Sequence, residues 1–170
     1  MKHIIASLLF LATITVFADP APFGLEIGKA SVADAEKMYS IEKSGNAEYH
    51  EGVVYKVAVN QVAFEGLKEL TLVFNEKNVL EAVIATLPNS QFESLHESLS
   101  KKYKVIGEKN PYVGDKQMDY VNGSTRISLT AKHLSFNMNM IYMHKDLLSA
   151  LIAQEKEEEA SKKKSQEDKL

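Results

Sequence analysis

Two apolar, β-rich runs joined by a short polar turn constrain the fold more than any other part of the chain. The first run ends at Phe74, and the second, from Val79 to Leu87, follows the turn sequence Asn-Glu-Lys-Asn. Apolar runs separated by a short Asn-containing loop predict an antiparallel β-hairpin. Pro88 has no N–H to donate to a strand ladder, so we expect the second strand to end there.

An amphipathic helix is expected directly after this hairpin. Ser90 followed by Glu93 matches a capping box, in which Ser is the N-cap and Glu reaches back to its N–H. An apolar stripe at helical spacing follows, made of Phe92, Leu95, Leu99 and Tyr103. An earlier short helix is predicted with Ser31 as its N-cap and Asp34 in its first turn.

Several further segments alternate apolar and polar residues with the period of a strand. They are residues 23–27, 53–59, 117–121, 124–131 and 136–143, and residues 104–107 begin a strand or a turn. Asn122-Gly123 is the preferred pair for a two-residue hairpin turn, whereas Ser44-Gly45-Asn46 is expected to break the chain. Alternation of this kind implies an antiparallel sheet with one buried and one wetter face. The predicted fold class is therefore α+β, with short helices packed on an antiparallel sheet.

A weak internal repeat has an offset of 64 residues. Lys37-Met38-Tyr39-Ser40-Ile41 resembles Lys101-Lys102-Tyr103-Lys104-Val105, and each copy ends a predicted helix and precedes several strands. Two α-β-β-β halves that share one sheet, at residues 23–88 and 89–145, would explain the repeat, although a chance match is a serious alternative.

The first 18 residues have the pattern of a secretory signal peptide. A short basic segment, Met1-Lys2-His3, precedes an apolar stretch from Ile4 to Val16, and Val16-Phe17-Ala18 supplies small residues for cleavage after Ala18. About 13 apolar residues fall short of the roughly 20 that span a bilayer, which disfavours a membrane anchor. We therefore expect an exported protein, located in a Gram-negative periplasm or secreted.

The remainder is expected to form one domain, residues 19–153, followed by a charged tail, residues 154–170. The chain has no Cys, which excludes a disulfide framework and a lipid-bearing Cys anchor. The tail is a run of Glu followed by a run of Lys. A frayed or disordered segment is the simpler interpretation of such a block, and an electrostatic docking arm is the alternative.

No pattern in the chain predicts catalysis. The sequence has no Gly-x-Ser-x-Gly, no phosphate-binding glycine loop and no His-Glu-x-x-His, so we predict no catalytic, cofactor-binding or metal-binding residues. Convergence of Ser, His and acid residues through folding is left open. His96 adjoins the helix stripe and is interpreted as a packed histidine. The net charge of −3 gives no reason to expect a nucleic-acid partner.

Three side chains are candidates for an interaction surface: Tyr112, Tyr120 and Met143. Tyr is enriched at protein interfaces, and Met adapts to irregular partners. Ordinary half-buried positions in the sheet are the competing interpretation for all three residues.

The segment from Phe23 to Ser31 combines an apolar strand pattern, a Gly turn and a Ser-capped helix. It resembles the start of small bacterial envelope domains, namely the outer-membrane assembly lipoproteins of the SmpA type and the β-lactamase-inhibitor-protein-like repeats. The resemblance implies a protein that binds another envelope protein, as an assembly factor or an inhibitor, without catalysis. The alternative expectation is a periplasmic carrier that holds a small ligand or lipid on the concave sheet face.

Overall fold

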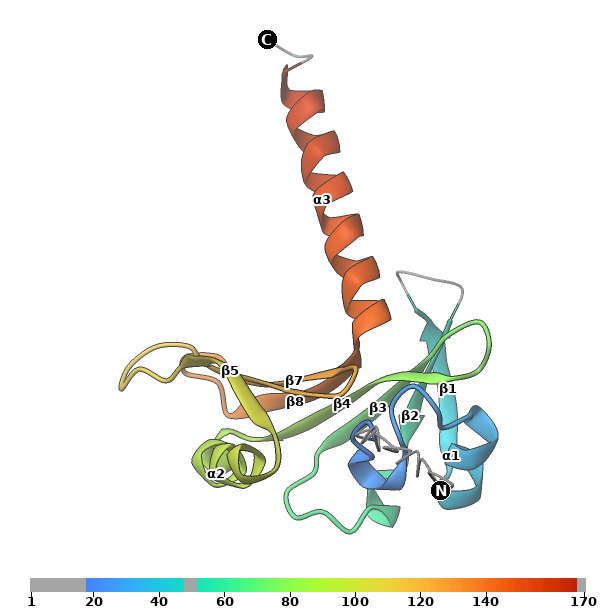
Figure 1. Cartoon of the computed structure of the whole chain (residues 1–170). Coiled ribbons are helices and arrows are strands. Elements are labelled where there is room, and N and C mark those ends of the chain that lie inside the picture. The colour runs from blue at the N-terminus through green and yellow to red at the C-terminus, as the bar shows by residue number, and fades with distance from the viewer. Residues whose placement is uncertain (1–17, 48–51, 168–170) are drawn as a thin grey trace, which may run out of the picture.

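The computed structural model describes residues 18–47 and 52–167. Most of the predicted signal peptide, residues 1–17, lies outside the described residues. The fold is α+β, an open eight-stranded antiparallel sheet with three helices (Figure 1), as the sequence predicted. Within the described residues, no helix is both long enough and apolar enough to cross a lipid bilayer.

The elements follow one another in a repeating order. The helices are α1 (Val32–Met38), α2 (Phe92–Lys102) and α3 (Lys145–Glu167), with short 3-10 turns η1 (Pro22–Gly24), η2 (Val59–Gln61) and η3 (Asn89–Gln91). The strands are β1 (Ile41–Asn46), β2 (Val53–Val57), β3 (Glu69–Phe74), β4 (Leu80–Pro88), β5 (Lys104–Lys109), β6 (Lys116–Asn122), β7 (Thr125–Ala131) and β8 (Asn137–His144).

The strand order β1-β2-β3-β4-β8-β7-β6-β5 places the last strands of the two repeats side by side at the centre of the sheet. There β4 and β8 pair over seven residues, from Ala82 opposite Met143 to Pro88 opposite Asn137. Each of α1 and α2 is followed by four strands, one more than the α-β-β-β pattern that the sequence suggested. The two sets of four strands run outward from the centre in matching order.

The strand that the sequence missed is β1, which contains the predicted break Ser44-Gly45-Asn46. The chain continues through this segment because the pairing register shifts between Lys43 and Gly45, which is the signature of a β-bulge. The opposite edge strand, β5, has a similar shift between Val105 and Gly107. Bulges and lysines on edge strands disfavour pairing with further chains.

The internal repeat corresponds to equivalent positions in the structure. Tyr39 and Tyr103, which lie 64 residues apart, are the C-caps of α1 and α2, and both have an extended backbone. Their N–H groups donate to the carbonyl oxygens of Ala35 and Leu99, over 2.9 and 2.8 Å. In both repeats the tyrosine therefore marks the point where the helix turns into an edge strand.

The prediction of a strand at residues 23–27 is wrong. Phe23 has a φ of 53° and Gly24 a φ of 80°, so the chain forms the 3-10 turn η1 instead. The Tyr39 hydroxyl donates to the Phe23 carbonyl over 2.8 Å and holds this turn against the end of α1. Leu25 and Ile27 are both buried, which explains why their spacing resembled a strand with one apolar face.

The two predicted helix starts have different outcomes. Ser31 is the N-cap of α1 and Asp34 lies in its first turn, as predicted, and the two side chains together form a capping box. The capping box predicted at Ser90 is wrong, because η3 precedes α2 and the N-cap is Gln91 without a side-chain hydrogen bond. The last helix continues through Glu167, so the segment expected to be frayed or disordered is helical through that residue.

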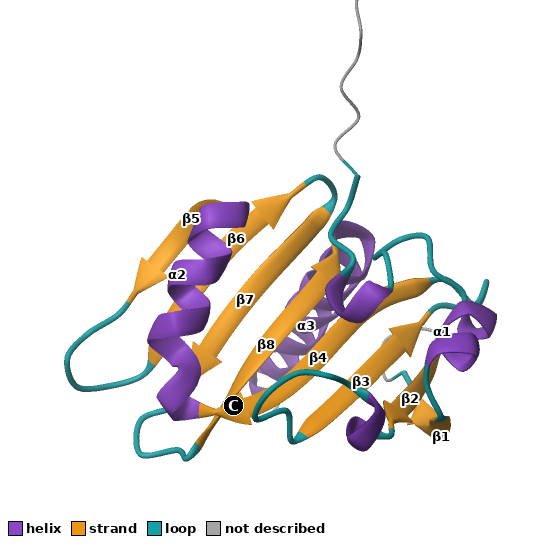
Figure 2. Ribbon diagram, turned by 90° about the horizontal axis from the view of Figure 1, so that it is seen from below, coloured by secondary structure: helices purple, strands orange, loops and turns teal. Residues whose placement is uncertain are grey.

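Both α1 and α2 pack on the same face of the sheet and cover the main core (Figure 2). Alternate residues of the central strands point into this core, for example Val83 and Ala85 of β4 and Met140 of β8. The opposite face, which we call the open face, carries the first turns of α3 and no other helix of the described residues, and the rest of α3 projects away from the sheet (Figure 1). The expected division into one buried and one wetter face is confirmed.

Candidate functional site

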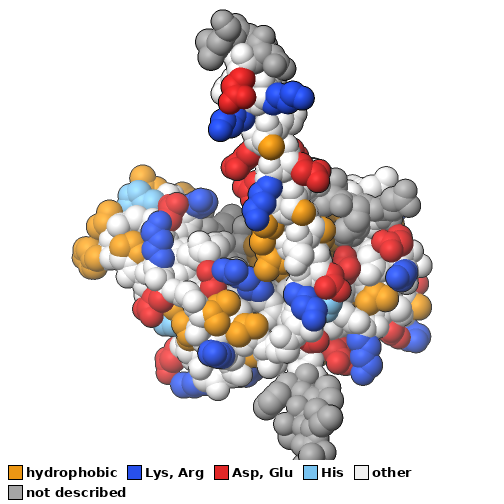
Figure 3. Space-filling view, turned by 45° about the horizontal axis from the view of Figure 1, so that its top comes forward, with side chains coloured by type: hydrophobic (Ala, Val, Ile, Leu, Met, Phe, Trp, Pro, Cys, Tyr) orange, Lys and Arg blue, Asp and Glu red, His pale blue; other side chains and the backbone are white. Residues whose placement is uncertain are grey.

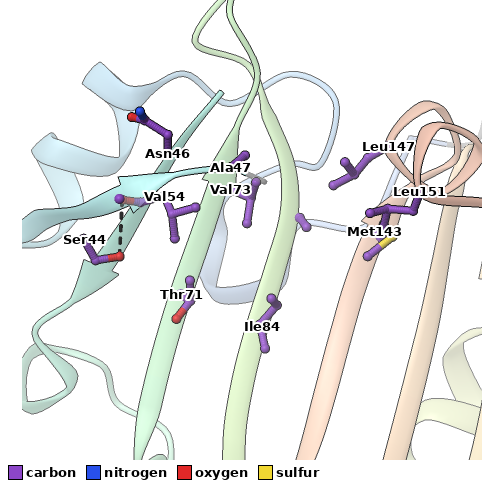
Figure 4. Close-up of a pocket in the computed structure, with 12 residues that line it drawn as sticks. Ser44, Asn46, Ala47, Val54, Thr71, Val73, Ile84, Met143, Leu147 and Leu151 are labelled. Atoms are coloured by element: carbon purple, nitrogen blue, oxygen red, sulfur yellow. Dashed lines mark hydrogen bonds between the residues drawn. The ribbon is translucent and has the colours of Figure 1, made fainter. Parts of the chain in front are cut away.

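An apolar groove lies on the open face where α3 leaves the sheet. It has a volume of about 340 Å³. Its lining comes from strands β1 to β4, the end of β8 and the start of α3, and consists of Ser44, Gly45, Asn46, Ala47, Val54, Thr71, Val73, Ala82, Ile84, Met143, Leu147 and Leu151. Leu147 and Leu151 lie on the helix side of this groove, and Val54 and Val73 lie on the sheet side (Figure 4).

The groove has a buried floor and partly exposed walls. Val73, Ala82 and Leu147 are buried and form a small cluster separate from the main core. Val54, Ile84, Met143 and Leu151 pack around this cluster and remain partly accessible. The first turns of α3 are thus fixed to the sheet, while apolar side chains stay available to a ligand or partner.

Polar groups of β1 and β3 contribute to the lining of the groove. The Ser44 hydroxyl donates to the Val54 carbonyl over 3.5 Å, and Asn46 and Thr71 also contribute to the lining. An apolar concave surface with a few polar groups is the usual composition of a binding site. This arrangement is suited to binding and contains no nucleophile paired with a base.

The second half of the open face is polar and is organised around Asp119 of β6. Its Oδ1 accepts from the Ser128 hydroxyl over 2.6 Å, and its Oδ2 accepts from the Gln117 side-chain amide over 2.8 Å. The Arg126 guanidinium makes an ion pair with Oδ2 at 3.1 Å. Asp119 itself is only 6% exposed, so these donors replace the water that its carboxylate has lost.

The electrostatics of Asp119 follow from these contacts. Burial by itself raises the pKa of Asp119, but the hydrogen bonds from Ser128, Arg126 and Gln117 outweigh it. The net result is a pKa below the ordinary value, so Asp119 is ionised at neutral pH. Because the Arg126 guanidinium already neutralises the charge of Asp119, we interpret this hydrogen-bond network as structural.

One cluster brings together residue types used in hydrolases. The Nδ1 atom of His96 lies 2.8 Å from the Tyr120 hydroxyl and 3.3 Å from the Ser100 hydroxyl. In the described part of the chain no carboxylate hydrogen-bonds to His96, and a nucleophile–base pair needs such an orienting group. The contacts instead satisfy the buried hydroxyl of Tyr120, whose pKa is raised by burial, and attach α2 to the sheet.

The three residues predicted for an interaction surface lie in three different places. Tyr112 is fully exposed in the loop between β5 and β6. Tyr120 is fully buried beneath α2, so it takes no part in any surface of the folded protein. Met143 lines the groove on the open face. The structure therefore brings only Met143 to the groove.

The other groove residues carry no local signal in the sequence. Val54, Ile84 and Leu151 lie far apart along the chain, and Val54 and Ile84 belong to strands whose neighbouring residues enter the main core. Only the pairing of β4 with β8, combined with the direction in which α3 leaves, brings them together. The alternation in β4 and β8 could have assigned Ile84 and Met143 to a common face, because the side chains next to each of them in sequence point to the core face.

No group of three or more metal-ligating side chains lies together within residues 18–47 and 52–167. Comparison of the chain with protein-family models, with curated proteins and with solved structures finds no match.

Proposed function

We propose that this chain is an exported, non-catalytic protein that binds an apolar segment of another envelope protein on its open face. The observation that carries the proposal is the apolar groove between the first turns of α3 and the sheet. An assembly factor or an inhibitor would both use such a surface, and the polar residues around Asp119 would lie beside the bound partner.

The composition of the open face supports a protein partner. Protein interfaces combine an apolar centre with a polar rim. Here the centre would be Ile84, Met143 and Leu151, and the rim would include Thr71 and Ser44. Anchoring side chains of a partner are most effective in a pocket that already excludes water on several sides, as this groove does.

Export is the second part of the proposal. It is supported by the basic and apolar segments before Ala18. The first residue after the expected cleavage site contacts the folded domain: Asp19 accepts from the Ser124 N–H over 2.6 Å and from the Thr125 hydroxyl over 3.0 Å. A mature chain that starts at Asp19 would keep both contacts, and we propose the periplasm as its location.

Site-specific photocrosslinking tests the proposal. A photoreactive residue is placed at Ile84 in the groove, and a matched one at Glu36, which is exposed on α1 on the covered side of the sheet. In cells of the source organism we expect one protein to crosslink at position 84 and not at position 36. The same products at both positions, or no product at 84, would contradict the proposal.

A small-ligand or lipid carrier is the second candidate, because the groove is largely apolar and its volume, about 340 Å³, lies in the range of small-molecule sites. Native mass spectrometry separates the two functions. A carrier would retain a molecule of constant mass that is lost in Ile84→Lys. A protein-binding module would show the mass of the chain alone.

A further inference from the structure

Four large apolar side chains are exposed together at the end of the sheet far from α3. They are Tyr112 (103% exposed), Val113 (68%), Leu134 (85%) and Phe136 (89%). Tyr112 and Val113 lie in the loop between β5 and β6, and Leu134 and Phe136 lie in the loop between β7 and β8. We call this group the apolar tip; hydrophobic side chains gather at this end of the molecule (Figure 3).

The two loops of the apolar tip are tied to each other. The Oδ1 atom of Asp115 accepts from the His133 N–H over 2.7 Å, and its Oδ2 atom lies 3.4 Å from the Lys132 ammonium. Strands β6 and β7 pair directly behind the loops, from Lys116 opposite Ala131 onward. The four apolar side chains are therefore presented by one structured unit.

The loop between β7 and β8 is also fixed to the body of the protein. The Asn89 N–H donates to the Phe136 carbonyl over 2.9 Å, and the Asn89 side-chain amide donates to the Ser135 carbonyl over 3.0 Å. Leu134 has a φ of 61°, a left-handed conformation that is unfavourable for a side chain of this kind. The surrounding contacts thus hold a strained backbone in a shape that keeps Leu134 in solvent, a pattern typical of functional sites.

The charge around the apolar tip differs from that of the chain as a whole. Residues 109–116 and 131–137 contain three lysines, Lys109, Lys116 and Lys132, and one acid, Asp115. Glu93 of α2 pairs with Lys116 at 2.6 Å, so the local net charge with this carboxylate included is +1. The full chain has a net charge of −3. An apolar, locally basic surface is complementary to a lipid membrane whose acyl chains are apolar and whose headgroups are anionic.

We propose that the apolar tip inserts into the interfacial region of a membrane that contains anionic phospholipids. Protruding loops suit this role, because a few side chains enter the acyl boundary while the lysines remain among the headgroups. Tyr is well suited to that boundary, since its ring is apolar and its hydroxyl is polar. The tip lies at the opposite end of the sheet from the base of α3 (Figure 1), so a docked protein would keep its groove free.

Vesicle flotation tests this inference with the purified full chain. One set of vesicles contains phosphatidylcholine with about 30% anionic phosphatidylglycerol, and the other contains phosphatidylcholine alone. We expect the unmodified chain to bind the anionic vesicles. The double variant Tyr112→Ser/Phe136→Ser should bind them with an affinity at least about tenfold lower. The matched control is Ile152→Ser, which removes a side chain that is 43% exposed on α3 and should bind as the unmodified chain does.

Two further experiments test the contribution of the lysine charges and the insertion of the apolar tip into the membrane. Lys109→Gln should weaken binding about fivefold at low salt, and raising the salt concentration should have a similar effect. Because the chain has no Cys, a Leu134→Cys variant can carry one environment-sensitive dye, which should shift to the blue on vesicles, whereas the dye on Ile152→Cys should not.

Three results would overturn the inference: equal binding by Tyr112→Ser/Phe136→Ser, equal blue shifts at both dye positions, or no vesicle binding at all. Self-association that depends on Tyr112 and Phe136 without vesicle binding would assign the apolar tip to a second copy of the chain instead. None of these results bears on the groove, so this inference fails or stands independently of the proposed function.

Discussion

The carboxylate of Asp119 is a buried charge whose partners all lie on the open face. Replacing it by Asp119→Asn keeps the size of the side chain but leaves Arg126 without its ion-pair partner and adds a donor that faces Gln117. We expect a loss of about 1–2 kcal/mol in the free energy of unfolding at pH 7, since Arg126 is partly exposed and recovers some hydration. Urea titration measures this loss.

The same residue predicts a pH dependence with a definite sign. The pKa of Asp119 in the folded protein lies below its ordinary value of 3.8, so the ionised form favours folding. Its contribution is present above about pH 4 and decreases as the pH falls further towards the folded pKa. The difference in the free energy of unfolding between the parent protein and Asp119→Asn should therefore decrease as the pH is lowered from 7 to 3. Glu36→Gln, at an exposed site on α1, is the control, and an unchanged difference at pH 3 would contradict this account.

Two serines provide a matched comparison between the helices. Ser31 caps α1, where its hydroxyl accepts from the Asp34 N–H over 3.2 Å, whereas Ser90 precedes α2 without capping it. Ser31→Ala should cost about 1 kcal/mol of stability, and Ser90→Ala should cost only a few tenths. Chemical denaturation of both variants measures the difference. Equal costs for the two variants would show that the cap at α1 does not stabilise the protein.

The same pair shows what a sequence pattern can predict about an element. Ser31 and Ser90 both precede an acidic residue by three positions, yet η3 delays the start of α2 and puts Gln91 at the N-cap. Hairpins were more predictable than helix starts, because turn residues act locally. The hairpin between β6 and β7 was placed one residue too early, however: Asn122 pairs with Thr125, so the turn is Gly123-Ser124 and not the predicted Asn122-Gly123, and Gly123 has the positive φ of 58°. The turn at Phe23 was missed because its left-handed backbone is stabilised by Tyr39, which is distant in the sequence.

At the scale of the whole molecule, the candidate sites differ in how far the sequence could reveal them. Alternation along β4 and β8 separates core from open-face residues, but the groove exists only because β4 pairs with β8 and the first turns of α3 pack on that face. Tyr112 could be singled out as an aromatic in a loop. Its neighbours Leu134 and Phe136 could not, because Phe136 continues the alternation of β8 and the pattern therefore assigns it to that strand, although β8 begins at Asn137.

The pairing of β4 with β8, which we call the β4–β8 seam, joins the two halves and predicts that they unfold together. Met140 of β8 is buried opposite Ala85 of β4, in a core cluster that includes residues of both halves. Met140→Ala should therefore lower the stability of the whole domain, by about 2–4 kcal/mol, because it leaves a cavity in the shared core. A small domain with one continuous core is expected to unfold in a single transition.

Dyes attached to each half check this expectation. Single cysteines at Lys37 on α1 and at Lys101 on α2 occupy exposed and comparable positions in a chain that otherwise has none. Both dyes should report the same urea midpoint, and Met140→Ala should move the two midpoints equally, since neither half buries its share of the seam alone. A midpoint that shifts only for the dye on α2 would mean that the second half unfolds by itself, and the sheet would then be two units joined at β4 and β8.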